Sequence, residues 1–465
     1  MKRLIAALLL TMPMAAPGCP QPAEQSRADP RIAQVVDTVS EARLQQLVER
    51  LASFGTRHTL SDGPSATRGI GAARQWIFDE LQRSSARLHV SFDTYRLAKD
   101  GRITRDVELR NIVAVLPGRS ARRVYVSAHY DTVNIPGGQL ASASRPAGQT
   151  VADPQLRADQ DYDVDAPGAN DNGSGTALTM ELARVLAESG LEFDATLVFA
   201  LWAGEEQGLF GSRAHAQRLA AGDIPVDAVL NNDIVGNSRG GNGVRDTATV
   251  RVYSNGPEDS ASRSLARYVA RVAALYLPGH RIRVMAREDR FNRGSDHSSF
   301  DHRGIPAVVF REANENFDRQ HAAADTADGV DAAYLARNAR VNAAVAASLA
   351  LAPPAPRVAT ERGQPTIGRQ PSGYDASLRW TAAPGAAAYR IYWRDASAND
   401  WQESLRVGNV TQYVLEKRSI DDHVFGVSAV GADGHESTIS AYVAPARTIT
   451  DVKLATEPAS AAPDR

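Results

Sequence analysis

Hydrophobic positions between residues 31 and 83 recur at the spacing of a helix. Such positions fall every three or four residues, so each group lines one face. The pattern predicts two amphipathic helices that pack on a core. The two groups are Leu44, Leu47, Val48 and Leu51, followed by Ile70, Ala73, Trp76, Ile77 and Leu81.

The pattern then changes to strands that alternate with helices. Residues His89–Leu97 alternate between hydrophobic and polar side chains, whereas Asn111–Leu116 and Val124–Ala128 are nearly continuous hydrophobic runs. This alternation predicts an α/β fold, with a mostly parallel twisted sheet flanked by helices on both faces. Further strands are predicted at Ala195–Ala203, Ala228–Asp233, Arg281–Met285 and Ala307–Phe310, and helices at Ser174–Glu188, Leu209–Ala221, Ser260–Leu275 and Ala332–Leu351.

The pattern changes again after residue 352. A Pro-rich linker is predicted at 353–358, because prolines are concentrated there. Short alternating strands follow, and they predict a small all-β sandwich over 359–447. Its clearest strands are Leu378–Thr381, Ala388–Arg394, Gln412–Leu415 and Val424–Val430, and residues 448–465 are expected to form a loose tail.

The first residues have the pattern of an export signal. Lys2 and Arg3 precede the hydrophobic run Leu4–Leu10, which is too short to span a bilayer. We therefore predict a signal peptide over 1–19 and a tether over 20–30. Gly18-Cys19 resembles the lipid-attachment site of bacterial lipoproteins; ordinary cleavage after Ala16 is the alternative. Either reading predicts an exported protein, periplasmic or outer-membrane-anchored or secreted.

Composition narrows the range of partners. The chain has 465 residues, of which 52 are basic and 54 acidic, so its net charge is −2. This balance gives no electrostatic reason to expect nucleic acid as a partner. Cys19 is the only cysteine, so no internal disulfide can form.

Candidate catalytic side chains follow the predicted strands. His129 and Asp131 end one strand, Asp171 opens a helix within Gly168–Gly175, and Glu205 and Glu206 directly follow another strand. Each has an ordinary structural explanation when taken alone, such as helix capping or exposure to solvent. The carboxyl ends of parallel strands meet at one edge of a sheet, which is where sites gather in such folds.

Two further positions complete the set. Asp233 is the last residue of the predicted strand Ala228–Asp233. His321 lies between the last strand and the last helix of the predicted α/β fold. Two imidazoles and three carboxylates suit Zn²⁺ or Mn²⁺. Three carboxylates nearly balance two divalent cations. The predicted ligands are His129, Asp171, Glu206, Asp233 and His321.

These motifs together resemble the M28 family of metallopeptidases, the co-catalytic zinc aminopeptidases. The resemblance covers residues from about 40 to 350 and implies the zinc exopeptidase fold. The motifs that carry it are His129-Tyr-Asp131, Gly168–Gly175, Gly204-Glu-Glu206, Asn232-Asp233, Ser295–Phe300, Gly304–Ala307 and His321-x-x-x-Asp325.

The resemblance implies a role for each residue. His129 and Asp233 would hold one zinc, Glu206 and His321 the other, and Asp171 would bridge the two. It further implies a cis peptide between Asp171 and Asn172. Glu205 would be the general base and Asp131 would support His129, whereas Asp296, His297 and Asp325 would lie behind the ligands.

The predicted sandwich resembles a fibronectin type III domain. Leu378-Arg-Trp380, Ala388–Tyr392 and Phe425–Val430 carry this resemblance, and His423 stands where that family usually has a tyrosine. We expect no catalytic groups in it. Contact with a cell surface or polysaccharide and a role as a spacer are both open.

The sequence thus predicts an exported zinc aminopeptidase that acts on peptides or proteins with two zinc ions per chain. Glutaminyl cyclases share this fold and much of this site, so cyclisation of N-terminal glutamine is an alternative. A binding protein on a peptidase scaffold is another, although such a protein would be expected to have lost ligands. The long segment Asn134–Pro167 leaves His129 and returns at Asp171, and we expect it to limit access to the site.

Overall fold

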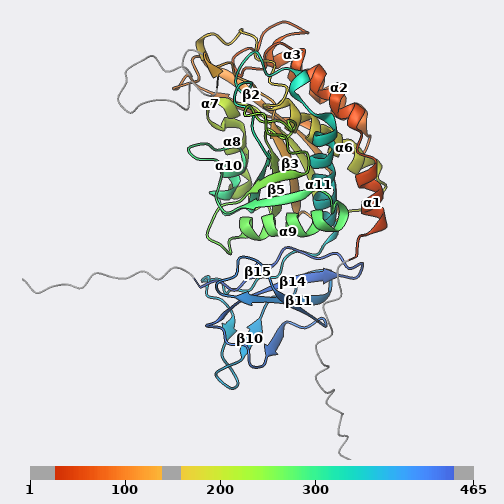
Figure 1. Cartoon of the computed structure of the whole chain (residues 1–465), viewed down its shortest axis with the longest axis vertical. Helices are drawn as coiled ribbons and strands as arrows, with labels where there is room; N and C mark the ends of the chain where they lie inside the picture. The colour runs from red at the N-terminus through yellow and green to blue at the C-terminus, as the bar shows by residue number, and fades with distance from the viewer. Residues whose placement is uncertain (1–26, 139–158, 445–465) are drawn as a thin grey trace, which may run out of the picture.

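The computed structural model describes residues 27–138 and 159–444. The predicted signal peptide with Cys19, most of the tether, the tail at 448–465 and the middle of the 134–167 segment lie outside the described residues. Within those two ranges no helix is long and apolar enough to cross a membrane. Figure 1 shows a larger α/β unit above a smaller β unit.

An eight-stranded sheet forms the centre of the α/β unit. Four of its seven neighbouring pairs are parallel, so the prediction of a mostly parallel sheet is confirmed. In spatial order the strands are β1 (His89–Leu97), β2 (Val107–Leu116), β4 (Thr196–Trp202), β3 (Arg123–His129), β5 (Val226–Asn232), β8 (Ala307–Glu312), β6 (Thr249–Tyr253) and β7 (Arg281–Met285).

Helices cover both faces of this sheet (Figure 1). On one face lie α1 (Pro30–Asp37), α2 (Glu41–Ala52), α3 (Gly69–Ser84), α6 (Gly173–Glu188), α9 (Ala261–Tyr276) and α11 (Ala332–Leu351). On the other lie α8 (Phe210–Ala221) and α10 (His297–Asp301). Most residues of α6 and α11 are buried, as expected for helices that are apolar on nearly all sides.

Capping residues define where several helices begin. The side chains of Ser40, Ser260 and Asp331 accept hydrogen bonds from backbone N–H groups in the first turns of α2, α9 and α11. Asp29 caps α1 in the same way. The last two residues of the predicted tether, 29 and 30, therefore belong to the folded unit.

Strand register brings the candidate residues to one edge of the sheet. His129, the last residue of β3, is paired with Trp202, the last residue of β4. On the other side of β3, Ser127 is paired with Asn231 of β5. Because these strands are parallel, the segments that follow them emerge side by side.

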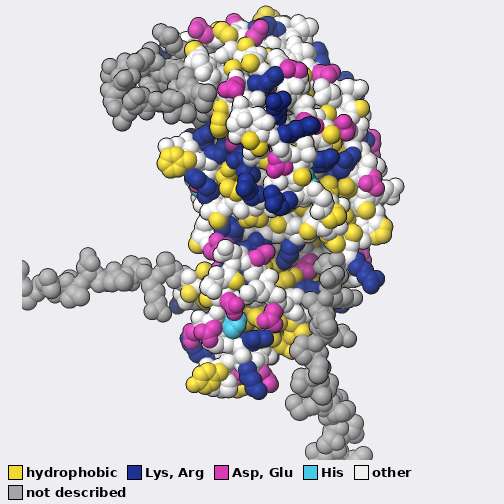
Figure 2. Space-filling view, viewed as in Figure 1, with side chains coloured by type: hydrophobic (Ala, Val, Ile, Leu, Met, Phe, Trp, Pro, Cys, Tyr) yellow, Lys and Arg dark blue, Asp and Glu magenta, His cyan; other side chains and the backbone are white. Residues whose placement is uncertain are grey.

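The smaller unit consists of two antiparallel sheets. One contains β12 (Glu403–Val407), β11 (Ala386–Asp395), β14 (His423–Gly431) and β15 (Ser440–Ala441), and the other β13 (Gln412–Leu415), β10 (Ala376–Arg379) and β9 (Ile367–Gly368). Trp380, Tyr389 and Phe425 are among the side chains buried between them. In Figure 2, acidic and basic side chains are distributed over both units on the face shown.

The two units are joined by polar contacts beside α9. Nη2 of Arg394 lies 2.9 Å from both carboxylate oxygens of Asp259. Only 3% of the Arg394 side chain and 13% of the Asp259 side chain are exposed. Ser264 of α9 also donates to the backbone oxygen of Ile439 at 2.5 Å.

We expect Arg394→Ala to lower the free energy of unfolding by about 2 kcal/mol, because Asp259 then keeps only Arg267, at 3.4 Å, as a charged partner in a largely buried position. Arg369→Ala is the control. Its ion pair with Asp421 is exposed on both sides, so the loss should be below about 1 kcal/mol. Urea denaturation followed by tryptophan fluorescence measures both, and equal effects would contradict the interpretation.

Candidate metal centre

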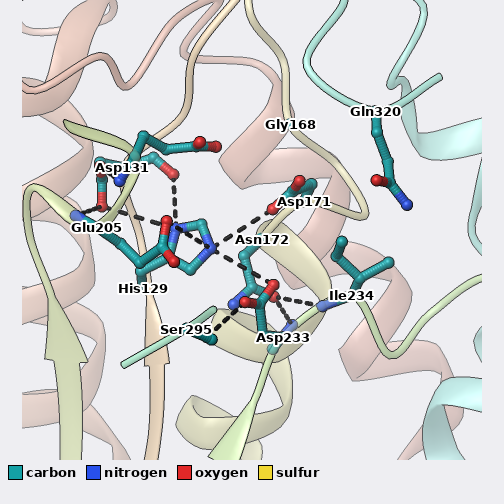
Figure 3. Close-up of polar contacts among 12 residues, drawn as sticks. His129, Asp131, Gly168, Asp171, Asn172, Glu205, Asp233, Ile234, Ser295 and Gln320 are labelled. Carbon is teal, nitrogen blue, oxygen red and sulfur yellow. Dashed lines mark hydrogen bonds and ion pairs between the residues drawn. The ribbon is translucent and has the colours of Figure 1, made fainter. Parts of the chain in front are cut away.

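Among the residues that the structure describes, two groups of three side chains could each hold a metal ion. His129, Asp171 and Asp233 form the first, and Asp171, Glu206 and His321 form the second. The ligand atoms of each group lie within 4.8 Å of one another. Asp171 belongs to both groups, so its carboxylate is placed to bridge two cations. Figure 3 shows His129, Asp171 and Asp233 with their side chains directed toward one another.

The first group is built around the ring of His129. Its Nε2 lies 3.4 Å from Oδ1 of Asp171 and 3.5 Å from Oδ1 of Asp233. Its Nδ1 lies 3.2 Å from the backbone oxygen of Asp131. A proton on Nδ1 that is donated to this oxygen leaves the Nε2 lone pair free for a cation.

The second group is more open to solvent. Nε2 of His321 lies 3.0 Å from Oδ2 of Asp171 and 3.2 Å from Oε2 of Glu206. The side chain of His321 is 13% exposed. The backbone oxygen of His321 accepts from the N–H of Ile135 at 2.8 Å, so the start of the 134–167 segment lies against this histidine.

The chemistry of these donors fits a divalent metal. Oδ1 of Asp233 and Oε1 of Glu206 are buried and accept no hydrogen bond from the described residues. Burial also raises the pKa of Glu206 and of Glu205 well above the ordinary value. A cation satisfies the free acceptors and offsets the repulsion between the carboxylates.

Asp171 is held by its own loop and by Asp325. The peptide bond between Asp171 and Asn172 is cis, as the family resemblance implies. The carboxylate of Asp325 accepts from the N–H groups of Asn170 at 3.0 Å and Asp171 at 2.8 Å. Nδ2 of Asn172 donates to the backbone oxygen of Asn232 at 2.8 Å, which ties this loop to β5.

Arg57 supports the same loop and was not predicted from the sequence. Its side chain is fully buried and donates to the backbone oxygens of Pro167 at 2.6 Å and Gly168 at 2.9 Å. Burial lowers its pKa to about 10, while Asp325, Asp131 and Asp171 oppose that shift. In the sequence Arg57 is far from the motifs, and no pattern in its neighbouring residues distinguishes it from a surface arginine.

Asp233 is held by two residues. Oγ of Ser295 donates to its Oδ2 at 2.5 Å, and Nη1 of Arg311 lies 2.9 Å from the same oxygen. Arg311 is fully buried and also binds Asp289 at 2.8 Å. The other oxygen of Asp233 is thereby left free to contact a cation. Ser295 belongs to a motif of the resemblance, whereas the sequence analysis did not identify Arg311.

The turn that carries Glu205 and Glu206 follows β4. The backbone N–H groups of Glu205 and Glu206 donate to the carboxylate of Asp131 at 3.2 and 3.1 Å. Asn111 of β2 accepts from the N–H of Ala203 at 3.0 Å and donates to the oxygen of Gly211 at 3.0 Å. Asn111 thus fixes both ends of the turn, a role that its place in a hydrophobic run did not reveal.

Glu205 lies beside the groups without belonging to either. Its Oε2 is 4.0 Å from Nε2 of His129, and 12% of its side chain is exposed. Figure 3 shows Glu205 on the Asp131 side of His129. A carboxylate in this position can exchange a proton with a molecule bound at the groups.

Asp296 and His297 are buried behind the site and belong to neither group of three. Burial raises the pKa of Asp296 to about 7. Nε2 of His297 lies 2.9 Å from the backbone oxygen of Glu288. Of the three residues expected behind the ligands, Asp325 therefore makes the direct contact with the Asp171 loop.

Comparison with known proteins gives one consistent family. Residues 111–346 match the model of peptidase family M28. A probable zinc metalloprotease of Leptosphaeria maculans is 37% identical over 453 residues, which is 90% of this chain and 96% of that protein. Another from Pyricularia oryzae is 38% identical over 440 residues, covering 86% and 82%.

Among solved structures, the chain is similar to two Legionella pneumophila proteins. The LapA aminopeptidase has a TM-score of 0.52 and 20% identity, covering 73% of this chain and 78% of that one. LapB has a TM-score of 0.52 and 18% identity, covering 72% and 78%. These two similarities concern the fold. The family model and the two relatives show the family: the chain belongs to peptidase family M28.

Proposed function

We propose that this protein is an exported aminopeptidase that hydrolyses N-terminal peptide bonds with two zinc ions. The observation that carries the proposal is the shared carboxylate of Asp171, which belongs to two groups of metal-binding side chains. His129 and Asp233 would hold one ion, and Glu206 and His321 the other. When bound, two zinc ions lower the pKa of the attacking water and polarise the scissile carbonyl.

Glu205 is the proposed general base. Its carboxylate is close to His129 but is not needed in either group of ligands. It would take the proton of the attacking water and pass it to the departing amine. Burial raises the pKa of Glu205, which makes its carboxylate a stronger base than an exposed one.

Asp131 is the proposed positioning residue for this chemistry. Its backbone oxygen faces Nδ1 of His129, and its carboxylate holds the N–H groups of Glu205 and Glu206. One buried residue would thereby fix a ligand of each ion and the base. The peptide or protein substrate would reach the site where Glu205 and His321 are partly exposed.

The proposed activity requires a free N-terminal amine. We expect the zinc-loaded protein to cleave aminoacyl anilides and to leave their N-acetylated counterparts intact. Glu205→Gln should lower kcat by at least about 100-fold, because the proton acceptor is lost. Steady-state assays of anilide cleavage measure both effects.

Glu49→Gln is the matched control, because this glutamate is exposed on α2; it should keep full activity. Full activity of Glu205→Gln would contradict the assigned base. Cyclisation of N-terminal glutamine without anilide hydrolysis would instead favour a cyclase.

The bridging role of Asp171 predicts a metal count. The purified chain should hold two zinc ions, chelation should abolish hydrolysis, and added zinc should restore it. Asp171→Asn weakens a ligand of both groups, so it should retain fewer than one ion. Elemental analysis of dialysed protein measures this. The control is Asp37→Asn, at an exposed position at the end of α1, which should keep two zinc ions. A single tightly held ion in the active wild-type protein would contradict the dizinc proposal.

Export and lipid attachment are proposals from the first nineteen residues. If Cys19 is lipidated, the protein expressed in a bacterium will be found in the membrane fraction, and Cys19→Ala will be released from it. Cell fractionation with immunoblotting measures the shift. Equal distributions of the wild-type protein and Cys19→Ala would favour ordinary signal cleavage.

We also propose that the smaller β unit resembles a fibronectin type III domain. Contact of this unit with a cell surface or a polysaccharide would not depend on lipid attachment at Cys19.

A further inference from the structure

A cluster of arginines beside the metal centre takes no part in the proposed mechanism. Arg251, Arg290 and Arg293 all contact the carboxylate of Glu315, at 2.7, 2.6 and 3.2 Å. Only 3% of the Glu315 side chain is exposed. Although burial opposes its ionisation, the arginines, Arg290 first, lower the pKa of Glu315 to about 2. We call Arg251, Arg290, Arg293 and the neighbouring Arg311 the arginine cluster.

The arginine cluster extends to Asp233. Arg290 contacts Asp289 at 3.2 Å, and Arg311 contacts both Asp289 at 2.8 Å and Asp233 at 2.9 Å. Four guanidinium groups therefore surround three carboxylates, those of Glu315, Asp289 and Asp233. Asp233 also belongs to the first metal-binding group. An excess of positive charge in a largely buried place favours the binding of an anion.

Arg293 is the most exposed member of the arginine cluster and has free hydrogen-bond donors. Its Nη1 donates to Glu315 at 3.2 Å and to Oε1 of Gln320 at 3.1 Å. Among the residues that the structure describes, Nε and Nη2 of Arg293 have no hydrogen-bond partner, and 19% of the side chain is exposed. A guanidinium with two free donors can bind a carboxylate through two parallel hydrogen bonds.

Arg293 is connected to both metal-binding groups through its neighbours. Its partner Gln320 directly precedes His321, and Ser295, two residues further along the chain, binds Asp233. Figure 3 shows Gln320 beyond Asp171, on the side of the site away from Glu205. Burial lowers the pKa of Arg293, and Glu315 and Asp171 are the carboxylates that oppose this effect.

We propose that Arg293 binds a carboxylate of the peptide substrate and gives the enzyme a preference for substrates with an anionic group next to the cleaved bond. The carboxylate can come from an acidic side chain or from the C-terminus of a dipeptide. This inference rests on the proposed peptidase function. A solely structural role of Arg293 beneath Glu315 would instead affect all substrates equally.

Four substrates separate these sources: Leu-Ala, Leu-Ala amide, Leu-Glu amide and Leu-Gln amide. With the full zinc-loaded chain, kcat/KM for an anionic substrate should exceed that for its neutral counterpart by about tenfold, in one pair or in both. Arg293→Gln should bring this ratio close to one. Because each ratio compares two substrates of the same protein, a general loss of activity cancels.

Arg287→Gln is the matched control. Arg287 is an exposed arginine of the same loop, and its guanidinium lies over the ring of Phe291 at 5.9 Å. This variant should keep the wild-type ratio. Ratios near one in the wild type, or an unchanged ratio in Arg293→Gln, would overturn the inference. Failure to hydrolyse all four of these substrates and the aminoacyl anilides as well would instead overturn the proposed aminopeptidase function.

Salt provides a second test should Arg293→Gln not fold. Raising the ionic strength from about 0.01 M to about 1 M shortens the screening length from about 30 Å to about 3 Å. The wild-type preference for the anionic substrate should therefore fall as salt is added. A preference that is independent of salt would contradict binding by Arg293.

Discussion

The repulsion between carboxylates around Asp171 is the constraint on which this structure depends. Asp131, Asp171, Glu206 and Asp233 are all less than a tenth exposed, and the partly exposed Glu205 stands beside them. Such a set is unfavourable in a protein interior unless positive charge is supplied. His129 reflects the same balance: burial opposes its protonation, yet the carboxylates, Glu205 first, raise its pKa well above the ordinary value. Bound cations would replace that proton.

The surrounding structure holds these carboxylates in place from several directions. Arg57 binds the backbone on one side of Asp171, and Asp325 accepts the N–H of Asp171 itself. Arg311 and Ser295 occupy one oxygen of Asp233 and leave the other free. Preorganisation of this kind lets ligands bind metal without first rearranging. It also connects the centre to the arginine cluster, which joins metal binding to the proposed recognition of substrate.

Much of this could be predicted from the sequence because the strands are buried and parallel. Hydrophobic runs locate such strands, and His129, Glu205 and Asp233 follow directly after them. Arg57, Asn111 and Arg311 could not be identified, because each acts on backbone or side chains distant in the sequence. The strand β6 and the short helix α7 (Glu205–Gly208) were not predicted, whereas the predicted helix Leu209–Ala221 agrees with α8 to within one residue; Leu209, with a φ of 59°, lies between these two helices.

The most direct test of the account is a crystal structure of the zinc-loaded protein, with data collected on both sides of the zinc absorption edge. The account predicts two anomalous peaks about 3.5–4 Å apart, one beside His129 and Asp233 and one beside Glu206 and His321, with Asp171 contacting both. A single peak in the active protein, or two peaks that share no carboxylate of Asp171, would contradict it.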